Sequence, residues 1–484
     1  MTFSIVTIFP FYLLSPPINL PFPLPAGYLT KPTGQLLQFY QTSLPPTASP
    51  TIPDLLTFIM TTILTAAFKT IPQTKRSFTS KCVPWWNKDC TNALQRKRAA
   101  WRRYRRRYHT PGRLQAFIAF KHASAVLKRV VNHSKTQSWR SYVSSISSTT
   151  IISAVWRGLH KISGKYPPLP APVLHLNNTY IAEPLQVATE FASYFSCVSK
   201  GLHLSPSFQS LKHSTESSPI RFSLSSSEYY NAPFTLRELT HALHRCQNTS
   251  PGPDSIHYNM LKHLSTHSLT LLLTLYNKIW MEGTFPAEWR HALVLPFLKP
   301  HKAGSTPQDY RPIALTNTLC KLFERLVNSR LLWLLESKNL LSSSQYGFRQ
   351  GRSTADPLTF LETYILSAFA SKQVVLAVFF DLEKAYDTTW RYHILHQLYS
   401  WNISGNMGIF LQSFLSHRSF QVRIANTLSP SYTQYEGVPQ GSVLSTTLFI
   451  IAINNIVSSL PIGVRSSLYV DDCHLFRWPL SCFS

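Results

Sequence analysis

Hydrophobic residues recur along most of the chain with the spacing of α-helices, and in a few short runs with that of buried strands. The apolar stretch 55–68 predicts one helix that Asp54 caps and Pro72 stops, because proline lacks the amide hydrogen. A similar pattern predicts a helix over residues 184–199. Two runs rich in β-branched and aromatic residues predict strands: QVVLAVFFDL (373–382) and SSLYVDDCHLF (466–476). The patterning therefore predicts an α+β protein.

Changes in composition divide the chain into four segments. Residues 1–80 are rich in proline and have no steady period, so they are a poor candidate for an autonomous domain. Residues 81–165 predict a basic helical region, with a turn at Pro111-Gly112 followed by a helix over about 113–142. Residues 166–230 are rich in Ser and Pro and are interpreted as a linker that contains one helix. Residues 231–484 are expected to form one continuous α+β domain.

The charge balance narrows the kind of partner. Lys and Arg number 47 against 21 Asp and Glu, which gives a net charge of +26 and favours a polyanion such as nucleic acid. Eight of the twelve residues 96–107 are basic, with Trp101 and Tyr104 between them. A charge run is often only a solvated helix face, but too few acids lie nearby to neutralise this one. The candidate nucleic-acid contacts are Arg102, Arg103, Arg105, Arg106 and Arg107.

Cysteine usage and hydropathy indicate the compartment. Seven scattered cysteines without a CxxC pair argue against a disulfide scaffold and against a zinc module. No stretch reaches the roughly 18 unbroken apolar residues of a membrane span. The apolar N-terminus lacks the basic residues of a secretory signal, since the first lysine is Lys31. We expect an intracellular protein that is not secreted and has no membrane partner, with both nucleus and cytoplasm open.

Acidic residues end the two predicted strands. Asp381 follows one apolar run, and Asp471 and Asp472 follow the other. Ionised carboxylates at the ends of buried strands need a compensating cation, because desolvation costs several kcal/mol per group. Carboxylate oxygens suit Mg²⁺, and two such ions about 4 Å apart can activate a hydroxyl and stabilise a leaving pyrophosphate. Neighbouring strand residues point to opposite faces, so only one acid of the pair can face Asp381, and we assign Asp471 to that position.

A series of motifs stands in a fixed order around these acids. They are SPGPDSI (250–256), LPFLKP (295–300), DYRPIALTNTLCKLFERLV (309–327), QYGFRQGRST (345–354), FFDLEKAYD (379–387), EGVPQGSVLS (436–445) and YVDD (469–472). With this series the chain resembles the reverse transcriptases of non-LTR retrotransposons, most closely the jockey-like group of LINE elements. The resemblance covers about half of the chain. It implies an RNA-directed DNA polymerase with a right-hand fold, of which fingers and a partial palm with a ferredoxin-like (RRM-like) core follow the basic helical region.

The resemblance also implies roles for single residues. Asp381 and Asp471 would bind two Mg²⁺ ions, or Mn²⁺ in their place, with Asp472 beside them. The nucleotide-binding residues would be Lys299 and Arg311 at the triphosphate, Tyr386 as a steric gate against the ribose 2′-hydroxyl, and Gln440 beside nucleotide and template. Each has an ordinary alternative, as a surface cation, a core tyrosine or a turn residue. In the loop 347–354, Arg349 and Arg352 would contact the template backbone, or else lie on a solvated turn.

The implied partners are an RNA template, a DNA primer and deoxynucleoside triphosphates, while the sequence identifies no protein partner. Only twelve residues follow Asp472, so we expect the thumb to be missing and an apolar sheet face and edge to be exposed. Residues 1–80 lack the acid and histidine cluster of an endonuclease and are interpreted at most as its tail. Two alternatives stay open: an inert relic that only binds nucleic acid through its basic helices, and a palm-type RNA polymerase, which Tyr386 disfavours.

Overall fold

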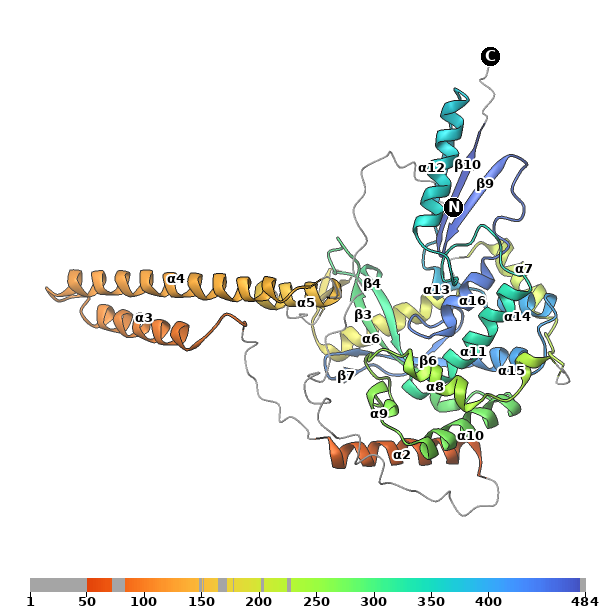
Figure 1. Ribbon diagram of the computed structural model, residues 1–484, viewed down its shortest axis with the longest axis horizontal. Helices are drawn as coiled ribbons and strands as arrows, with labels where there is room; N and C mark the ends of the chain where they lie inside the picture. The colour runs from red at the N-terminus through yellow and green to blue at the C-terminus, as the bar shows by residue number, and fades with distance from the viewer. Residues whose placement is uncertain are drawn as a thin grey trace. The chain divides into compact units, whose positions relative to one another are not determined.

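The computed structural model describes residues 50–71, 83–147, 150, 152–163, 172–176, 178–201, 204–223 and 228–478. The chain divides into two compact units. The described part of the first lies within residues 83–163, and that of the second comprises residues 50–71 and the residues from 172 onward. Each unit is described by itself below (Figure 1).

The first unit is a helical hairpin with a short third helix. Helices α3 (Lys88–Arg106) and α4 (Arg113–Ser144) run side by side, and α5 (Ile152–Ser163) follows (Figure 1). Asn87 caps α3 by accepting a hydrogen bond from the amide of Cys90. An aromatic cluster packs the two long helices together, with ring centroids 4.9 Å apart for Trp101 and Phe120 and 5.4 Å apart for Tyr104 and Phe117. Helices α3 and α4 thus lie within the segment 81–165, and α4 begins directly after the Pro111-Gly112 turn.

The second unit contains two separate larger sheets. The five-stranded sheet has the order β4-β3-β6-β7, with β8 also paired to β6. Its strands are β3 (His291–Leu298), β4 (Tyr310–Leu315), β6 (Arg418–Ile424), β7 (Thr427–Leu428) and β8 (Tyr432–Gln434). Strands β3 and β6 are parallel, and the other pairs are antiparallel. Helix α6 (Pro184–Ser199) packs on this sheet through a core cluster that includes Phe191 and Val422.

The second sheet is antiparallel and has the order β5-β10-β9. Its strands are β5 (Leu376–Asp381), β9 (Val464–Tyr469) and β10 (Asp472–Arg477). Helix α12 (Ala355–Ala370) lies along it (Figure 1), and its Phe360 and Tyr364 rings contact Phe476 of β10. A two-residue turn of Val470 and Asp471 joins β9 to β10, so this hairpin carries the YVDD motif at its tip.

A helical core occupies the rest of the second unit. Its largest buried side chains include Trp280, Trp289 and Phe323. The long central helix is α11 (Thr318–Ser337), with twelve buried residues. Around it lie α2 (Ile52–Thr70), α8 (Leu236–His244), α9 (Tyr258–Lys262), α10 (Thr266–Glu282), α14 (Arg391–Ser400), α15 (Asn406–Leu415) and α16 (Leu444–Ala452). The remaining elements are β1 (Leu174–Leu176), β2 (Thr179–Ile181), α7 (Pro206–Glu216) and the short α13 (Ala385–Thr388).

Two of the predicted segments contain a helix that packs into the second unit. Helix α6 has the predicted bounds, but it covers the five-stranded sheet instead of lying in a linker, because Val187, Phe191 and other apolar residues bury one of its faces. Helix α2 was assigned to a poorly defined segment and instead packs on α10, with seven buried residues. Thr51 is its N-cap, and Asp54 completes the capping box three residues later. The rest of the predicted segment 1–80, namely residues 1–49 and 72–80, lies outside the described residues.

Helix α2 also bears on the membrane prediction. Among the described helices it is the one whose length and apolar composition would allow it to cross a membrane. Its buried side chains, such as Leu55, Leu56 and Ile59, belong to the main hydrophobic core. This packing accounts for the apolar composition without a membrane.

Candidate active site

The backbone brings the three predicted acids to one end of the antiparallel sheet. Asp472, the first residue of β10, is the direct partner of Asp381, the last residue of β5. Directly opposed residues of an antiparallel pair have Cα atoms about 4.5 to 5.5 Å apart and project from the same face. Asp471 precedes Asp472 in the hairpin turn, after Val470, whose φ of 61° lies in the left-handed region. Three carboxylates therefore gather at the tip of the hairpin.

The register corrects one detail of the sequence argument. We expected Asp471 to stand opposite Asp381, whereas Asp472 takes that place. Alternation of faces holds only in extended backbone, and Asp471 lies in a turn that follows a left-handed residue. The expected burial of the strand on both faces is also wrong, because Leu376, Val378 and Phe379 of β5 are exposed.

The electrostatics of the acid group favour a bound cation. Although the Asp472 side chain keeps contact with solvent, partial desolvation raises its pKa, and the negative charges of Asp471 and Asp381 raise that pKa further. Three oxygen donors of this kind suit a hard divalent ion. Within the part of the chain that the structure describes, however, no three His, Cys, Asp or Glu side chains already converge closely enough to hold one. The donor chemistry fits, and the side chains would have to turn inward on binding.

Tyr386 lies beside this group on α13, which begins four residues after β5 ends. Its ring stacks on Phe449 with centroids 4.9 Å apart, and its pKa is raised by burial and by the charge of Asp471. The loop 436–442 is held against the same backbone, because the amide of Val438 donates to the carbonyl of Tyr386 at 2.8 Å. Any side chain at Gly437 would collide with that carbonyl, which explains why this position needs glycine.

Gln440 is fixed by its main chain. Its carbonyl accepts a hydrogen bond from the amide of Ala314 on β4 at 2.6 Å. A side chain at Gly441, whose φ is 129°, would collide with the carbonyl of Ala314. The side-chain oxygen Oε1 of Gln440 is buried and has no hydrogen-bond partner among the residues that the structure describes. An acceptor in that position is available to a donor on a bound ligand.

The two cations predicted for the triphosphate sit on neighbouring strands. Lys299 follows β3, where its Nζ donates to the carbonyl of Gln308 at 2.9 Å. Arg311 lies on β4, is exposed, and pairs with Phe297 across the sheet. Burial raises the pKa of Asp387 to about 6, and the nearby charge of Lys299 opposes that shift. Lys299 is therefore close to α13, which carries Tyr386.

Comparison with known proteins agrees with this geometry. Residues 299–477 match the family model described as reverse transcriptase (RNA-dependent DNA polymerase). Residues 299–477 thus resemble a reverse transcriptase domain. This confirms the resemblance inferred from the motifs.

Three relatives from Drosophila melanogaster illustrate the match. The probable RNA-directed DNA polymerase from transposon BS is 35% identical over 220 residues, 45% of this chain and 24% of that protein. The probable RNA-directed DNA polymerase from transposon X-element is 31% identical over the same shares. The RNA-directed DNA polymerase from mobile element jockey is 28% identical over 264 residues, 51% of this chain and 28% of that protein. The chain thus spans about a quarter of the length of the curated relatives it matches.

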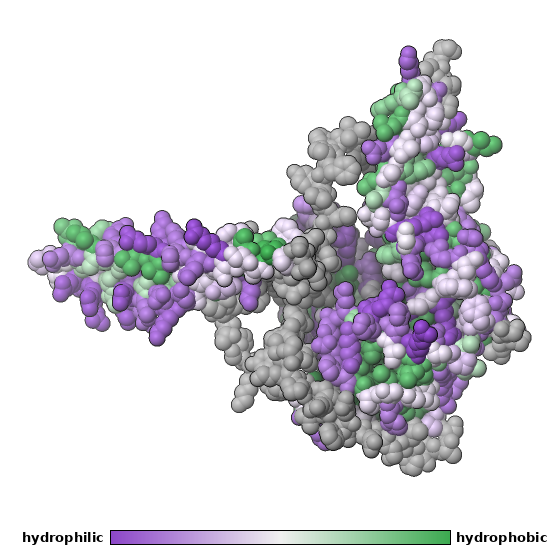
Figure 2. Space-filling model, in the orientation of Figure 1, coloured by the Kyte–Doolittle hydropathy of each residue, from purple (hydrophilic) through white to green (hydrophobic). Residues whose placement is uncertain are grey.

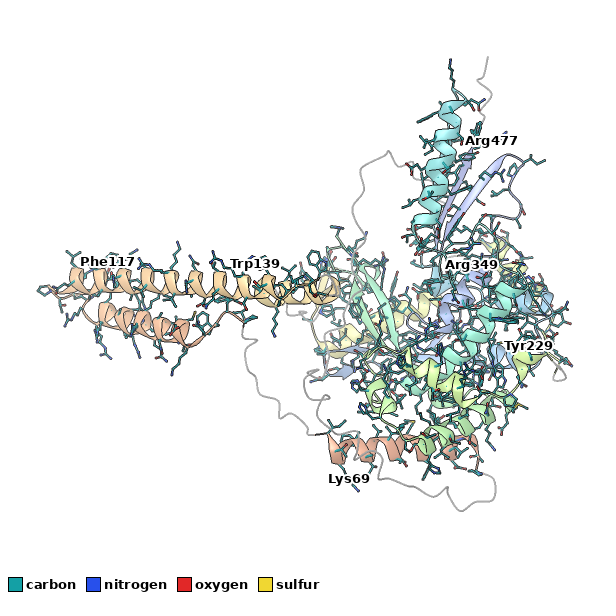
Figure 3. All side chains as sticks on the ribbon, viewed as in Figure 1. Lys69, Phe117, Trp139, Tyr229, Arg349 and Arg477 are labelled. Carbon is teal, nitrogen blue, oxygen red and sulfur yellow. The ribbon has the colours of Figure 1, made fainter. Side chains whose placement is uncertain are left out.

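Arg349 of the reverse transcriptase domain does not occupy the predicted position on a template-facing loop. Its side chain is 6% exposed and forms an ion pair with Glu336, with Nε donating to Oε1 at 2.7 Å. It also donates to the carbonyl of Ser342 at 2.8 Å (labelled in Figure 3). Arg352 is half-buried and donates to the carbonyl of Ser343 at 2.7 Å. A guanidinium that is already paired and buried cannot reach a phosphate without breaking these bonds, so Arg349 is a structural residue.

Two buried acids have structural roles, and of these Glu324 was not singled out from the sequence. Glu324 of α11 is fully buried and accepts hydrogen bonds from the Ser442 hydroxyl and from the amides of Val443 and Leu444, where α16 begins. Asp254 of the SPGPDSI motif accepts from the amide of Thr318 at 2.6 Å and so caps α11. Both acids hold loops that reach the site. A polar residue inside an otherwise apolar helix was the available signal for Glu324.

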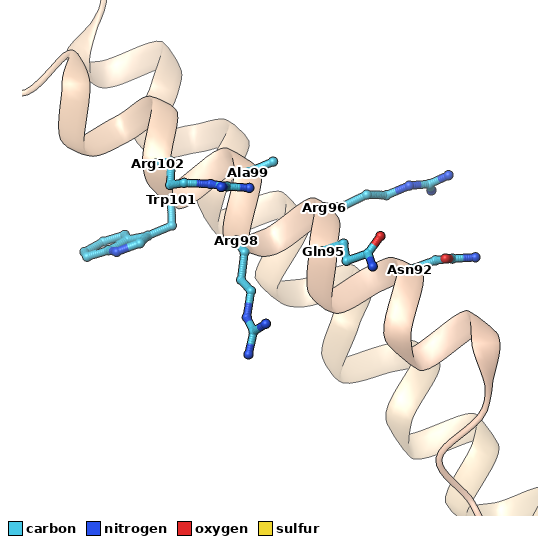
Figure 4. Close-up of a pocket in the computed structure, with 7 residues that line it drawn as sticks. All are labelled: Asn92, Gln95, Arg96, Arg98, Ala99, Trp101 and Arg102. Carbon is cyan, nitrogen blue, oxygen red and sulfur yellow. The ribbon is translucent and has the colours of Figure 1, made fainter.

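The five arginines predicted to bind nucleic acid in the basic helical region are all exposed on the hairpin of α3 and α4. Arg102, Arg103, Arg105, Arg106 and Arg107 lie on α3 and at its C-terminus. Figure 2 shows hydrophilic residues along much of this hairpin, and Figure 4 shows Asn92, Gln95, Arg96 and Arg102 projecting from α3. A hollow of about 850 Å³ lies there, lined by Asn92, Gln95, Arg96, Arg98, Ala99, Trp101 and Arg102.

Proposed function

We propose that this chain contains the nucleotide-transfer site of an RNA-directed DNA polymerase. The observation that carries the proposal is the register that opposes Asp472 to Asp381, with Asp471 in the adjoining turn. In this proposal the three-stranded sheet belongs to the palm of a right-hand polymerase, and β3 and β4 belong to the fingers. The reaction would join a deoxynucleoside triphosphate to a DNA 3′-hydroxyl on an RNA template.

The proposed roles follow from position and charge. Asp381, Asp471 and Asp472 would hold magnesium or manganese, which when bound supplies charge neutralisation at the reacting phosphate. Lys299 and Arg311 would bind the triphosphate, since cations on β3 and β4 can neutralise charge that develops on the leaving pyrophosphate.

Two further residues would contact the nucleotide. Tyr386 stands on α13, and burial and the charge of Asp471 raise its pKa. In this position its ring would leave no room for a 2′-hydroxyl. Gln440 would offer its unpaired Oε1 as a hydrogen-bond acceptor to the nucleotide or template.

Primer extension tests the proposal. The full chain is mixed with a labelled DNA primer on an RNA template, deoxynucleoside triphosphates and Mg²⁺ or Mn²⁺. We expect extension by the wild-type chain and none by Asp381→Asn or Asp471→Asn. Glu362→Gln is the matched control, because Glu362 is an exposed acid on α12 and should keep full activity. Near wild-type extension by either Asp variant would refute the metal assignment. No incorporation by the wild-type chain with either metal would favour the alternative of an inert nucleic-acid-binding relic.

We propose in addition that the hairpin of α3 and α4 binds nucleic acid through phosphates. Residues 83–163 contain 17 Lys and Arg and a single acid, Asp89. No ion pair is found among the described residues of this hairpin, so the guanidinium groups face solvent without a protein counter-charge. Self-repulsion on that scale is relieved by a polyanion. The salt dependence of binding tests this proposal, as developed in the Discussion.

A further inference from the structure

A short segment before α12 is bound to the tip of the hairpin that carries Asp471 and Asp472. The amide of Leu468 donates to the carbonyl of Ser344 at 2.8 Å, and the amide of Tyr346 donates to the carbonyl of Leu468 at 2.9 Å. These bonds make residues 344–346 a parallel neighbour of the end of β9. The segment therefore contacts the strand just before the turn that contains the acids.

Gln345 connects the segment to the turn itself. Its side-chain oxygen Oε1 accepts hydrogen bonds from the amide of Val470 at 3.1 Å and from the amide of Gly347 at 2.9 Å. Gln345 is 1% exposed, so these two bonds form away from water. The Val470 amide lies one residue before Asp471.

Val470 needs such support because of its backbone conformation. A φ of 61° is unfavourable for a β-branched residue, so it persists only where the surroundings impose it. Val470 is 8% exposed. A Cβ on Gly347 would lie 2.7 Å from the amide nitrogen of Val470 and 2.5 Å from Cγ2 of Val470, so the segment is in close contact with the turn.

The segment is in turn held rigidly by the helices behind it. Arg349 bridges Glu336 of α11 to the carbonyl of Ser342. The side chain of Asn454 accepts from the amide of Ser342 at 2.8 Å and donates to the carbonyl of Leu340 at 3.1 Å. A continuous set of hydrogen bonds thus runs from α11 through Gln345 to the acid-bearing turn.

We propose that Gln345 is a positioning residue that holds Val470 in its left-handed conformation and thereby sets the direction of Asp471 and Asp472. The inference rests on the proposed function, since it concerns the same acids. A group that orients metal-binding side chains without touching the metal typically changes metal affinity or activity 10- to 100-fold when it is removed.

A double-mutant cycle tests the proposal. Gln345→Met keeps the size of the side chain and removes the acceptor. Val470→Gly removes the strain, because glycine adopts positive φ freely. The two variants, their combination and the control Gln350→Met, an exposed glutamine in the same loop, are made in the full chain. Three quantities are measured at a temperature at which circular dichroism shows every variant to be folded: Mn²⁺ affinity by electron paramagnetic resonance, the single-turnover extension rate, and the dissociation constant for primer and template.

We expect Gln345→Met to weaken Mn²⁺ binding and to slow single-turnover extension by about 10- to 100-fold, with primer-template affinity unchanged. The same substitution in the Val470→Gly background should cost less than about threefold, because the strained residue is gone. Gln350→Met should behave as wild type.

Two results would overturn the inference while leaving the proposed function intact: wild-type Mn²⁺ affinity and rate in Gln345→Met, or an equal loss in both backgrounds, which would indicate general destabilisation. Failure of the wild-type chain to bind Mn²⁺ and to extend a primer would instead count against the proposed function itself.

Discussion

Replacement of the five arginines within residues 102–107, at the end of α3, should flatten the salt dependence of nucleic-acid binding. The change is Arg→Gln at Arg102, Arg103, Arg105, Arg106 and Arg107, all of which are exposed. Glutamine and arginine have similar helix propensities, so α3 should keep its length. The aromatic contacts of Trp101 and Tyr104 with α4 are untouched, so the hairpin should also stay closed.

The magnitude follows from counterion release. Each phosphate contact contributes about 0.7 to the slope of log affinity against log salt for a single strand, and about 0.9 for duplex DNA. Five lost contacts would therefore reduce the slope by about 3.5 to 4.5. Between 50 and 200 mM salt, the wild-type chain should lose about 100- to 500-fold more affinity than the variant.

Fluorescence anisotropy with labelled single-stranded RNA and duplex DNA, titrated over this salt range, measures both slopes. Arg→Lys at the same five positions is the matched control, since it keeps the charge and should keep the slope. Equal slopes for the wild-type chain and the Gln variant would show that these arginines do not contact phosphates. A change of slope in the Lys control would mean that geometry, and not charge, governs binding.

Three further predictions concern the second unit. Tyr386→Val should raise the rate of ribonucleotide incorporation relative to deoxynucleotide by at least about tenfold, measured by single-nucleotide extension; an unchanged ratio would remove Tyr386 as the gate. Glu324→Ala should lower the free energy of unfolding by about 2 to 4 kcal/mol in urea titration, because the Ser442 hydroxyl and the amides of Val443 and Leu444 lose their shared acceptor. Burial raises the pKa of Asp254 to about 6, above its unfolded value near 4, so the native state holds this proton more tightly. Protonation of Asp254 therefore stabilises the native state, fully below about pH 4 and no longer once the pH has risen through 6. The free energy of unfolding of the wild-type chain should fall over this window more than that of Asp254→Asn. Parallel pH profiles of the two proteins would refute the raised pKa of Asp254.

Local patterns predicted the helices well and their partners poorly. Helices α4 and α6 end within two residues of their predicted bounds, because a turn or a proline marks the start of each and α6 also has an apolar stripe with 3.6-residue spacing. The same spacing carries no information on which surface covers that stripe. The face of α6 packs on strands more than 100 residues later in the chain, which its assignment to a linker with one helix did not predict.

At the acid site, too, the sequence predicted the strands but not which residues stand opposite each other. Strand patterns placed Asp381 and the pair Asp471-Asp472 at strand ends, and the structure confirms that these ends adjoin. The partner across the ladder was predicted incorrectly because it depends on where the turn falls. Val470 is a strong strand former that instead adopts the left-handed conformation, which neither its type nor its neighbours in sequence predict.

The loop 345–352 shows why a motif does not separate residues that contact substrate from residues that hold the site. Its arginines suggested phosphate contacts, yet Arg349 is paired with Glu336 and turned into the protein. Gln345, which suggested no chemistry, lies next to the acid-bearing turn, and its side-chain oxygen accepts a hydrogen bond from the amide of Val470, whose backbone conformation is unfavourable. A side chain of given type can contact a substrate or hold the protein together, and its burial and its hydrogen-bond partners decide between these two roles. In this domain the cost of a strained turn at the acids is offset by hydrogen bonds from a segment more than 100 residues earlier in the chain, so the precision of the site depends on residues that never meet the nucleotide.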